Sequence, residues 1–315
     1  MTDIDPKSLR LFAAVCDARN IKQAAAQEHI EPSAISKRIT QLEAQLGVAL
    51  LVRGRRGVQV TPAGQALLEH TRGLLFTLDR LHADVAAFAG GIKGQVRLVA
   101  SASAIAELLL EDLSIFMRMP EHAEIQVDIE ERNSRDIVRG VREGSASIGV
   151  CWDMVDFDEL KHQAYRDDEL VLAVPAGHAL AHRRSIRFAQ TLAFDHVGLP
   201  PATAVHTMLG RAAARAGASL TYRVIVSNFD SSLRVVAAGL AVSVIPRLVV
   251  ERSRSLGIVG ITLAESWAKR RFAICYRDLD SLTPAAARLV EHLAACAKVP
   301  ASKRASAPRG RKPSR

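Results

Sequence analysis

Hydroxyl and basic side chains gather in one short stretch near the N-terminus. Ser33, Ser36 and Lys37 recur at intervals of three and four residues, with Arg38 and Thr40 beside them. Such intervals place side chains on one face of an α-helix. Short hydroxyls let a helix backbone enter a DNA groove, and a basic side chain behind them can reach guanine or phosphate acceptors. This face could therefore hydrogen-bond to DNA, with a solvated surface helix as the alternative.

A second basic cluster follows in the run RGRRG at residues 53–57. The apolar runs 50–52 and 58–60 flank it, and each is typical of a short strand. Glycines between the two runs predict a basic hairpin that carries Arg53, Arg55 and Arg56. Arginines on such a hairpin suit contact with the DNA backbone or the minor groove.

Three helices must position the polar face, and capping residues mark where each one begins. Asp5 before Pro6 predicts the start of the first helix, because a carboxylate accepts hydrogen bonds from free backbone N–H groups and proline suits the first turn. Asn20 predicts the start of a second helix over about residues 21–28. Pro32 is suited to the first turn of the third helix.

The third helix carries an apolar stripe opposite its polar face. The stripe consists of Ile35, Ile39, Leu42 and Leu46, which we expect to face the core. Gly47 then ends the helix in the left-handed conformation that glycine tolerates. Two helices joined by a turn of three or four residues form the helix-turn-helix pattern.

An apolar repeat follows over residues 63–89, a stretch without proline. Its members, spaced alternately by four and three residues, are Leu67, Thr71, Leu74, Leu78, Leu81, Val85 and Phe88. This seven-residue repeat predicts the seam of a coiled coil that pairs two copies of the chain. The alternative, an amphipathic helix packed on its own domain, would have a wider apolar stripe.

Strands and helices alternate through the remaining two hundred residues. We expect strands at 96–100, 125–130, 147–151, 170–174, 196–199, 222–226, 242–245, 258–263 and 272–276, with helices near 103–118, 134–143, 203–216, 230–238 and 284–297. This alternation predicts a parallel, doubly wound α/β sheet.

Three segments within the first 64 residues closely match one known family. The runs LRLFAAV, AAAQEHIEPSAISKRITQLEAQLGV and RGRRGVQVTPAG resemble the N-terminal region of LysR-type transcriptional regulators. The resemblance is most specific over residues 7–64 and continues through the rest of the chain except its tail. One departure is Glu31, where the family often has serine at the cap before the recognition helix.

The resemblance implies an α+β multidomain architecture. A winged helix-turn-helix domain would occupy residues 1–62 and a linker and dimerisation helix residues 63–93. A two-lobed effector domain like a periplasmic binding protein would follow over 94–300, with lobe I about 94–163 and 268–300 and lobe II about 164–267. It also implies DNA contacts by Pro32, Ser33, Ser36, Lys37 and Arg53, with Arg38, Arg55 and Arg56 as further candidates.

Ligands of such folds lie beyond the carboxyl ends of strands, beside helix N-termini. Applied to this chain, the rule selects Ser101, Ser103, Ser134, Cys151, Pro201, Thr203, Asn228 and Asp230. Free N–H groups and hydroxyls would suit a small anion such as a carboxylate, and Arg135 and His206 could add charge. For each residue, plain helix capping is the alternative. We expect a non-covalent effector, with no cofactor and no metal.

The charge distribution is uneven. Residues 1–62 contain nine Lys or Arg and six Asp or Glu, and residues 301–315 contain six basic residues and no acid, whereas residues 94–300 contain twenty-four of each. The Pro-, Ser- and Arg-rich tail over 301–315 is expected to be disordered. Because the excess of positive charge lies at the two ends, the charge favours nucleic acid as a partner only for those ends.

Enzyme and membrane functions find little support. The sequence has no GxSxG, P-loop, HExxH or strand-associated GxGxxG motif, and its four cysteines lie far apart. Cys151 is the one candidate for a redox-active thiol. The acidic N-terminus is unlike a signal peptide, so we expect a cytoplasmic protein rather than an exported solute-binding protein. The expected partners are double-stranded DNA, a second copy of the chain, a small-molecule effector and, by resemblance, RNA polymerase.

Overall fold

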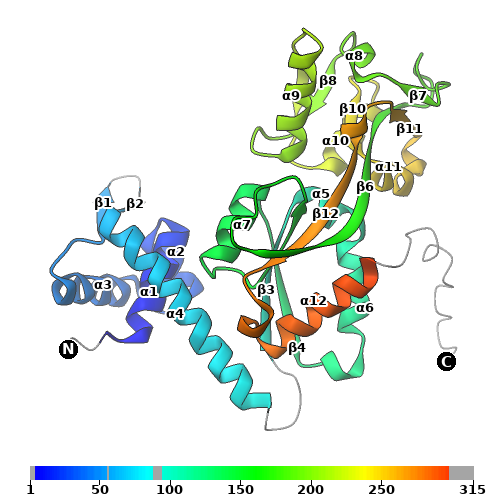
Figure 1. Ribbon diagram of the computed structural model, residues 1–315. Helices are drawn as coiled ribbons and strands as arrows, with labels where there is room; N and C mark the ends of the chain where they lie inside the picture. The colour runs from blue at the N-terminus through cyan, green and yellow to red at the C-terminus, as the bar shows by residue number, and fades with distance from the viewer. Residues whose placement is uncertain (1–3, 55–56, 88–93, 298–315) are drawn as a thin grey trace, which may run out of the picture. The chain divides into compact units, whose positions relative to one another are not determined.

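The computed structural model describes residues 4–54, 57–87 and 94–297 (Figure 1). The chain divides into two compact units, of which the N-terminal unit comprises residues 1–89 with 143–145 and the C-terminal unit the remainder. The predictions for Arg55, Arg56, Phe88 and the basic tail 301–315 lie outside the described residues.

The N-terminal unit consists of four helices and a hairpin. The elements are α1 (Pro6–Ala18), α2 (Ile21–Gln27), α3 (Pro32–Leu46), β1 (Leu51–Gly54), β2 (Gly57–Val60) and α4 (Pro62–Ala87). The predicted caps are confirmed, since the Asp5 carboxylate accepts a hydrogen bond from the Lys7 N–H at 3.0 Å and the Asn20 side chain accepts one from the Lys22 N–H at 2.9 Å. Gly47 has the expected left-handed backbone, with φ +68°.

The apolar stripe of α3 faces the core of this unit, with one exception. Ile35, Ile39 and Leu42 are buried together with Phe12 of α1. The prediction for Leu46 is wrong, because its side chain is 36% exposed. Leu46 is the last residue of α3 and lies past the part of the helix that packs against the core.

The strands of the hairpin, here called the wing (residues 51–60), extend further toward the turn than the predicted 50–52 and 58–60. β1 and β2 are antiparallel, and their ladder runs from the pair Leu51–Val60 to the pair Gly54–Gly57. Arg53 therefore lies within a strand rather than in the turn. Gly57 has φ +117°, and an added Cβ there would lie 2.6 Å from the Arg19 carbonyl oxygen, so the wing approaches the end of α1 too closely for a side chain.

The two ends of α4 differ in exposure. Leu68 and Thr71 are buried near the start, where α4 packs against α1. Further along, three apolar side chains of the predicted seam are exposed: Leu74 by 45%, Leu81 by 53% and Val85 by 64%. Only the C-terminal part of this helix therefore has an exposed apolar side, and Leu67 and Leu78 are half-buried.

The C-terminal unit is built on an eight-stranded sheet and a separate pair of strands. The strands are β3 (Gly94–Ala100), β4 (Ile125–Glu131), β5 (Ile148–Trp152), β6 (Lys161–Pro175), β7 (Ser185–Ile186), β8 (His196–Gly198), β9 (Tyr222–Ile225), β10 (Ser243–Pro246), β11 (Ile258–Leu263) and β12 (Lys269–Tyr276). The large sheet has the order β4-β3-β5-β12-β6-β11-β7, with β10 also paired to β6, and β8 pairs with β9.

The prediction of a wholly parallel sheet is wrong in part. β3 is parallel to β4 and β5, whereas β12 is antiparallel to both β5 and β6, and β10 and β11 are antiparallel to β6. The alternation of strands and helices does not report strand direction, and β6 and β12 pair with each other while running in opposite directions. The sheet is therefore mixed.

The helices of this unit flank three hydrophobic clusters, two in lobe I and one in lobe II. They are α5 (Ala102–Ala104), the π-helix η1 (Ile105–Leu109), α6 (Leu110–Met117), α7 (Ser134–Arg142), α8 (Phe188–Thr191), α9 (Ala204–Arg215), α10 (Phe229–Ala237), α11 (Arg247–Arg252) and α12 (Pro284–Ala297), with short 3-10 turns between some of them. Lobe I has buried residues between 96 and 165 and between 272 and 296, and lobe II has them between 170 and 268. β6 and β12 run from one lobe to the other (Figure 1). We call them the connecting strands.

Candidate nucleic-acid interface and ligand cavity

The predicted DNA-contacting residues of α3 lie opposite its buried stripe. Ser33, Lys37 and Thr40 are exposed, and Pro32 and Ser36 are half-buried. The first turns of α3 therefore present hydroxyl and ammonium groups on one outward face, as a recognition helix requires.

Glu31 does not cap α3 with its side chain, although it occupies the N-cap position. Only its carbonyl oxygen takes part, accepting hydrogen bonds from the N–H groups of Ala34 at 3.0 Å and Ile35 at 3.3 Å. The start of the helix is thus left without a side-chain acceptor, the arrangement that favours binding of an anion at a helix N-terminus.

Arg38 lies on the same helix but makes contacts inside its own unit. Its guanidinium donates hydrogen bonds to the Asp5 carboxylate at 2.7 Å and to the Ser8 hydroxyl at 3.3 Å. The pKa of Asp5 is lowered, first by the backbone N–H of Lys7 and then by Arg38 and Ser8. Arg38 therefore links α3 to the start of α1, a contact that its position in the sequence did not suggest.

Glu43 is a positioning residue that sequence reasoning missed. Its Oε1 atom accepts hydrogen bonds from the backbone N–H groups of Leu50 at 2.8 Å and Leu51 at 3.1 Å. These bonds attach the start of β1 to α3, so a carboxylate of the recognition helix holds the wing. Arg53 lies on β1, and nothing is described of its side chain.

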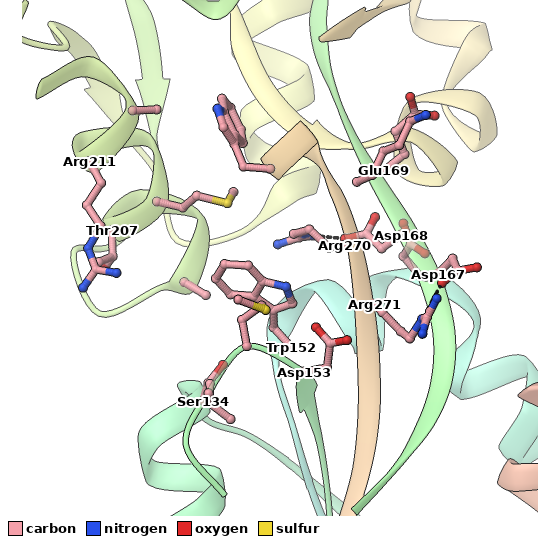
Figure 2. Close-up of a pocket in the computed structure, with 18 of the residues that line it drawn as sticks. Ser134, Trp152, Asp153, Asp167, Asp168, Glu169, Thr207, Arg211, Arg270 and Arg271 are labelled. Carbon is pink, nitrogen blue, oxygen red and sulfur yellow. Dashed lines mark hydrogen bonds and ion pairs between the residues drawn. The ribbon is translucent and has the colours of Figure 1, made fainter. Parts of the chain in front are cut away.

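Two cavities lie between the lobes of the C-terminal unit. The larger one, about 1620 Å³, is lined by the π-helix η1, the start of α7, the end of β5, helix α9 and both connecting strands (Figure 2). The smaller one, about 330 Å³, is lined by residues of α5, α10 and α11 among others. Ligand sites occur preferentially in clefts between two folded parts of a protein, so both cavities are candidates for a small-molecule site.

The predicted effector residues are divided between these cavities. Ser134 and Pro201 line the larger cavity, and Thr203, Asn228 and Asp230 line the smaller one. Ser101, Ser103 and Cys151 are buried and line neither cavity. The rule that ligands lie beyond strand ends thus leads to the space between the lobes, but it does not unite these residues in one site.

The prediction that Cys151 contacts the effector is wrong by one residue along β5. It is fully buried in a core cluster beside Cys275, and the contact with Cys275 together with burial raises the pKa of its thiol well above the ordinary value. The next residue, Trp152, ends β5 and lines the larger cavity (Figure 2). Successive strand side chains point to opposite faces, so the cavity meets the tryptophan and not the thiol.

The polar residues of the smaller cavity also form helix caps. The Thr203 side chain accepts a hydrogen bond from the His206 N–H at 3.3 Å, and the Asn228 side chain accepts one from the Ser231 N–H at 2.9 Å. The Asp230 carboxylate accepts a hydrogen bond from Arg234 at 2.9 Å. The capping alternative therefore accounts for these contacts of Thr203 and Asn228, whereas Asp230 lies within the first turn of α10 and pairs with Arg234 one turn further on.

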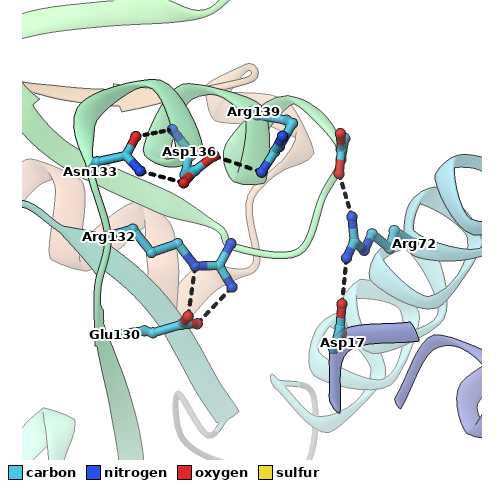
Figure 3. Close-up of polar contacts among 8 residues, drawn as sticks. Asp17, Arg72, Glu130, Arg132, Asn133, Asp136 and Arg139 are labelled. Atoms are coloured by element: carbon cyan, nitrogen blue, oxygen red, sulfur yellow. Dashed lines mark hydrogen bonds and ion pairs between the residues drawn. The ribbon is translucent and has the colours of Figure 1, made fainter. Parts of the chain in front are cut away.

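A cap also shapes the wall of the larger cavity at the start of α7. The Asn133 side chain accepts a hydrogen bond from the Asp136 N–H at 3.0 Å, and the Asp136 carboxylate accepts one from Arg139 at 2.6 Å (Figure 3). Arg132, just after β4, donates two hydrogen bonds to the carboxylate of Glu130 on β4, with both distances 2.7 Å. These contacts hold the β4–α7 connection that presents Ser134 to the cavity.

Opposite charges face each other along the connecting strands. In the ladder Asp167, Asp168 and Glu169 of β6 stand opposite Arg271, Arg270 and Lys269 of β12, in that order. Asp167 pairs with Arg271 at 2.9 Å, Asp168 pairs with Arg270, and Glu169 pairs with Arg247 of α11 at 2.6 Å (Figure 2). Burial lowers the pKa of Arg270 to about 10, which leaves it protonated at neutral pH.

Comparison with known proteins agrees with this architecture. Residues 6–65 match the family model described as bacterial regulatory helix-turn-helix protein, lysR family, and residues 89–297 match the LysR substrate binding domain. An uncharacterized HTH-type transcriptional regulator of Mycobacterium tuberculosis is 31% identical over 187 residues, which are 58% of this chain and 60% of that protein. The match thus spans less than two-thirds of that relative.

Three further similarities cover most of the chain. YbhD of Escherichia coli (strain K12), also an uncharacterized HTH-type transcriptional regulator, is 24% identical over 281 residues, 89% of this chain and 88% of that protein. The crystal structure of CbnR, a LysR family transcriptional regulator, has a TM-score of 0.66 at 23% identity and covers 94% of this chain and 100% of its own. A structure of full-length CbnR complexed with its target DNA gives 0.64 at 23% identity, with 93% and 100% covered.

The resemblance inferred from the sequence is therefore confirmed. The two family models together match nearly all of the described residues outside 66–87 of α4, and the fold agrees over both units. The chain belongs to the LysR family of bacterial regulatory helix-turn-helix proteins.

Proposed function

We propose that this LysR family member is a sequence-specific DNA-binding transcription regulator controlled by a small molecule bound between the lobes of its C-terminal unit. The observation that carries the proposal is the exposed polar face of α3, held by a buried apolar stripe and joined to the wing by Glu43. The family membership and the structure of CbnR with its target DNA support this proposal.

Recognition of DNA would rest on the first turns of α3. Ser33, Ser36 and Lys37 would contact base edges in the major groove, with Pro32 at the start of the helix. Because the Glu31 side chain does not cap α3, a DNA phosphate could accept hydrogen bonds at this end of the helix. Arg53 of the wing, with Arg55 and Arg56 beyond the described residues, would bind the backbone or the minor groove.

Dimerisation would follow from the exposed apolar side of α4. Leu74, Leu81 and Val85 expose apolar surface that a second copy of the helix would cover, with Leu67, Leu78 and Phe88 extending the seam. A dimer, or a dimer of dimers, would present two recognition helices to two half-sites of an operator.

Effector binding would change the arrangement of the lobes and, through it, of the paired DNA-binding units. Such control requires that the effector bind two arrangements with different affinity. A further partner that we propose is RNA polymerase, and the compartment is the cytoplasm. Among the described residues, no helix combines the length and apolar character needed to cross a bilayer.

Electrophoretic mobility shift with the promoter region upstream of the protein's own gene tests DNA recognition. Ser36→Ala should weaken specific binding about tenfold, and Lys37→Ala should weaken it and reduce its salt dependence. The matched control is Gln45→Ala, an exposed residue at the far end of α3. If neither the promoter nor any genomic fragment enriched by the protein is bound selectively, the proposal is wrong.

Sedimentation tests the seam independently. Leu74→Asp combined with Leu81→Asp should give monomers, because two charges at one helix pairing seam oppose association. Dimers that persist at the same protein concentration would place the principal interface elsewhere.

A further inference from the structure

Three deeply buried polar atoms of the larger cavity have no hydrogen-bond partner among the described residues. They are Oδ1 of Asp168, Nε of Arg270 and Oγ of Ser134, in residues that are 4%, 5% and 7% exposed. A buried polar atom without a hydrogen-bond partner destabilises the fold, so each of these atoms favours a ligand that supplies a partner. Asp168 lies on β6 and Ser134 lies at the start of α7. Because both residues line the larger cavity, one ligand could contact both.

Glu107 adds to the same cavity a carboxylate that has no hydrogen-bond partner within the described part of the chain. It lies in the π-helix η1 at a backbone break, with φ −90° and ψ −111°, and it is 6% exposed while lining the cavity. Isolated π-helical turns are frequent at functional sites. Burial raises the pKa of Glu107 to about 7, although Arg270 and Arg252 oppose this rise.

The cations near Glu107 are already paired with other groups. Arg270 donates to Asp168, and Arg252 forms an ion pair with Glu111 at 2.7 Å and donates to the Glu107 carbonyl oxygen at 2.7 Å. Arg270 bonds to Asp168, and its charge acts to lower the pKa of Glu107, which lines the same cavity. The Glu107 carboxylate and Oδ1 of Asp168 are therefore two acceptors open to a donor from a ligand, and Nε of Arg270 is a donor open to an acceptor.

The other end of the cavity has the opposite character. Ser134 begins α7, a nine-residue helix whose N-terminus attracts negative charge, and Arg135 follows it. Arg211 and Arg215 of α9 line the same cavity. In Figure 2 the Arg211 side chain extends from α9 toward the side of the cavity where Ser134 lies. Buried hydroxyl, helix terminus and arginines together suit a carboxylate.

We propose that the effector is a small zwitterion whose ammonium or amidinium group binds Glu107 and Asp168 and whose acid group binds Ser134, the start of α7 and the α9 arginines. This inference rests on the proposed function, and it specifies the effector class more narrowly than a carboxylate. The apolar part of such a molecule would be covered by three further residues of the cavity wall, Trp152, Trp267 and Met208.

Thermal shift and isothermal calorimetry with three matched series of probes test the inference. The series are ω-amino acids of increasing length with the common L-amino acids, the corresponding carboxylic acids without the amine, and the corresponding amines without the acid. At least one zwitterion should bind at least tenfold more tightly than both of its partial analogues. Acids that bind as tightly as zwitterions, or a series in which no zwitterion binds, would overturn the inference.

Two variants test which end of the larger cavity binds the cation and which binds the acid group. Glu107→Gln should weaken the best zwitterion at least tenfold and leave the weak binding of the matched acid unchanged, whereas Ser134→Ala should weaken both. Glu159→Gln, an exposed carboxylate of lobe I that lines neither cavity, is the control. Equal zwitterion affinity in the wild type and in Glu107→Gln would remove Glu107 from the site.

Proton release provides a readout that a merely structural role for Glu107 would not change. A cation that binds beside the Glu107 carboxylate stabilises its ionised form, so binding near pH 7 should release protons in the wild type and not in Glu107→Gln. Calorimetry in buffers of different ionisation enthalpy measures this release. Mobility shifts on the same protein preparations separate the two proposals, because intact DNA binding without zwitterion binding refutes only the effector class.

Discussion

One charged pair in the N-terminal unit and one in the C-terminal unit differ sharply in burial. In the N-terminal unit the pair Asp5–Arg38 is at the surface, with side chains 51% and 37% exposed, and it serves to orient helices. In the C-terminal unit the pair Asp168–Arg270 is almost completely buried at a cavity wall. An exposed pair can be lost at small cost, whereas a buried pair makes each partner depend on the other.

The largest expected effect concerns the buried pair. Arg270→Met leaves the Asp168 carboxylate buried without its partner, so we expect a loss of roughly 3–5 kcal/mol in the free energy of unfolding of the C-terminal unit. Urea denaturation followed by circular dichroism measures this loss. Arg270→Met combined with Asp168→Leu should recover most of the stability, and a double variant as unstable as the single one would contradict the comparison.

A backbone contact in the N-terminal unit should give the next largest effect. An added Cβ at Gly64 would lie 2.2 Å from the Leu50 carbonyl oxygen, so Gly64→Ala must displace α4 or the start of the wing. We expect the free energy of unfolding to fall by about 1–3 kcal/mol and specific DNA binding to be lost. Gly73→Ala on the same helix has open space around its Cβ and should be stabilising by up to about 1 kcal/mol. Equal effects of the two alanines in thermal unfolding would refute this difference.

The pH dependence of stability should distinguish Glu107 from surface carboxylates. Burial raises its pKa from 4.5 to about 7 in the folded protein, so its contribution to stability is complete below about pH 4.5 and is lost as pH rises through about 7. Relative to wild type, Glu107→Gln should therefore gain stability between pH 5 and 8, by on the order of 3 kcal/mol or less.

The charged groups that act on Glu107 are Arg270 of β12 and Arg252 and Glu251 of α11, and all of them remain in the variant. The difference in melting temperature between the two proteins thus isolates Glu107. A difference that does not change with pH would show that the carboxyl is not held in a buried, weakly hydrated site.

The smallest effect is expected at the wing. Glu43→Ala removes the acceptor of two backbone N–H groups, so the wing should loosen at a cost of about 1–2 kcal/mol. DNA affinity should fall while its salt dependence stays the same, because no phosphate contact is removed. Fluorescence anisotropy over a salt series measures both quantities, and Gln45→Ala is again the control. A changed salt slope would mean that Glu43 acts on DNA contacts directly.

The N-terminal unit was largely predictable because its signals are local. The caps Asp5 and Asn20, the stripe of α3 and the left-handed Gly47 depend on neighbours within one or two helical turns. The contacts of Arg38 and Glu43 were not predictable, because they join segments whose approach depends on the packing of α3 against α1 and the wing.

The residues that line the larger cavity were harder to predict from the sequence. Ser134 and Pro201 were selected by their positions after strands, but Glu107 has no such position and is directed into the cavity by a break within a helix. Cys151 was chosen where Trp152 lines the cavity, because the end of a strand does not reveal which face its last residues meet. The polar first half of β6 lacked an apolar run, so only residues 170–174 of this strand were predicted.

β6 is one continuous strand of fifteen residues that pairs with β12 over residues 161–169 and, in lobe II, with β10 and β11 over residues 170–175. The lobes are therefore joined by hydrogen-bonded sheet and not by flexible loops, and a change in their relative orientation must twist or bend two paired strands over several residues. Such deformation is stiff and of small amplitude, since each ladder bond resists it. Ligand binding at the connecting strands would accordingly be transmitted as a torsion of the sheet, without a wide opening of the cleft.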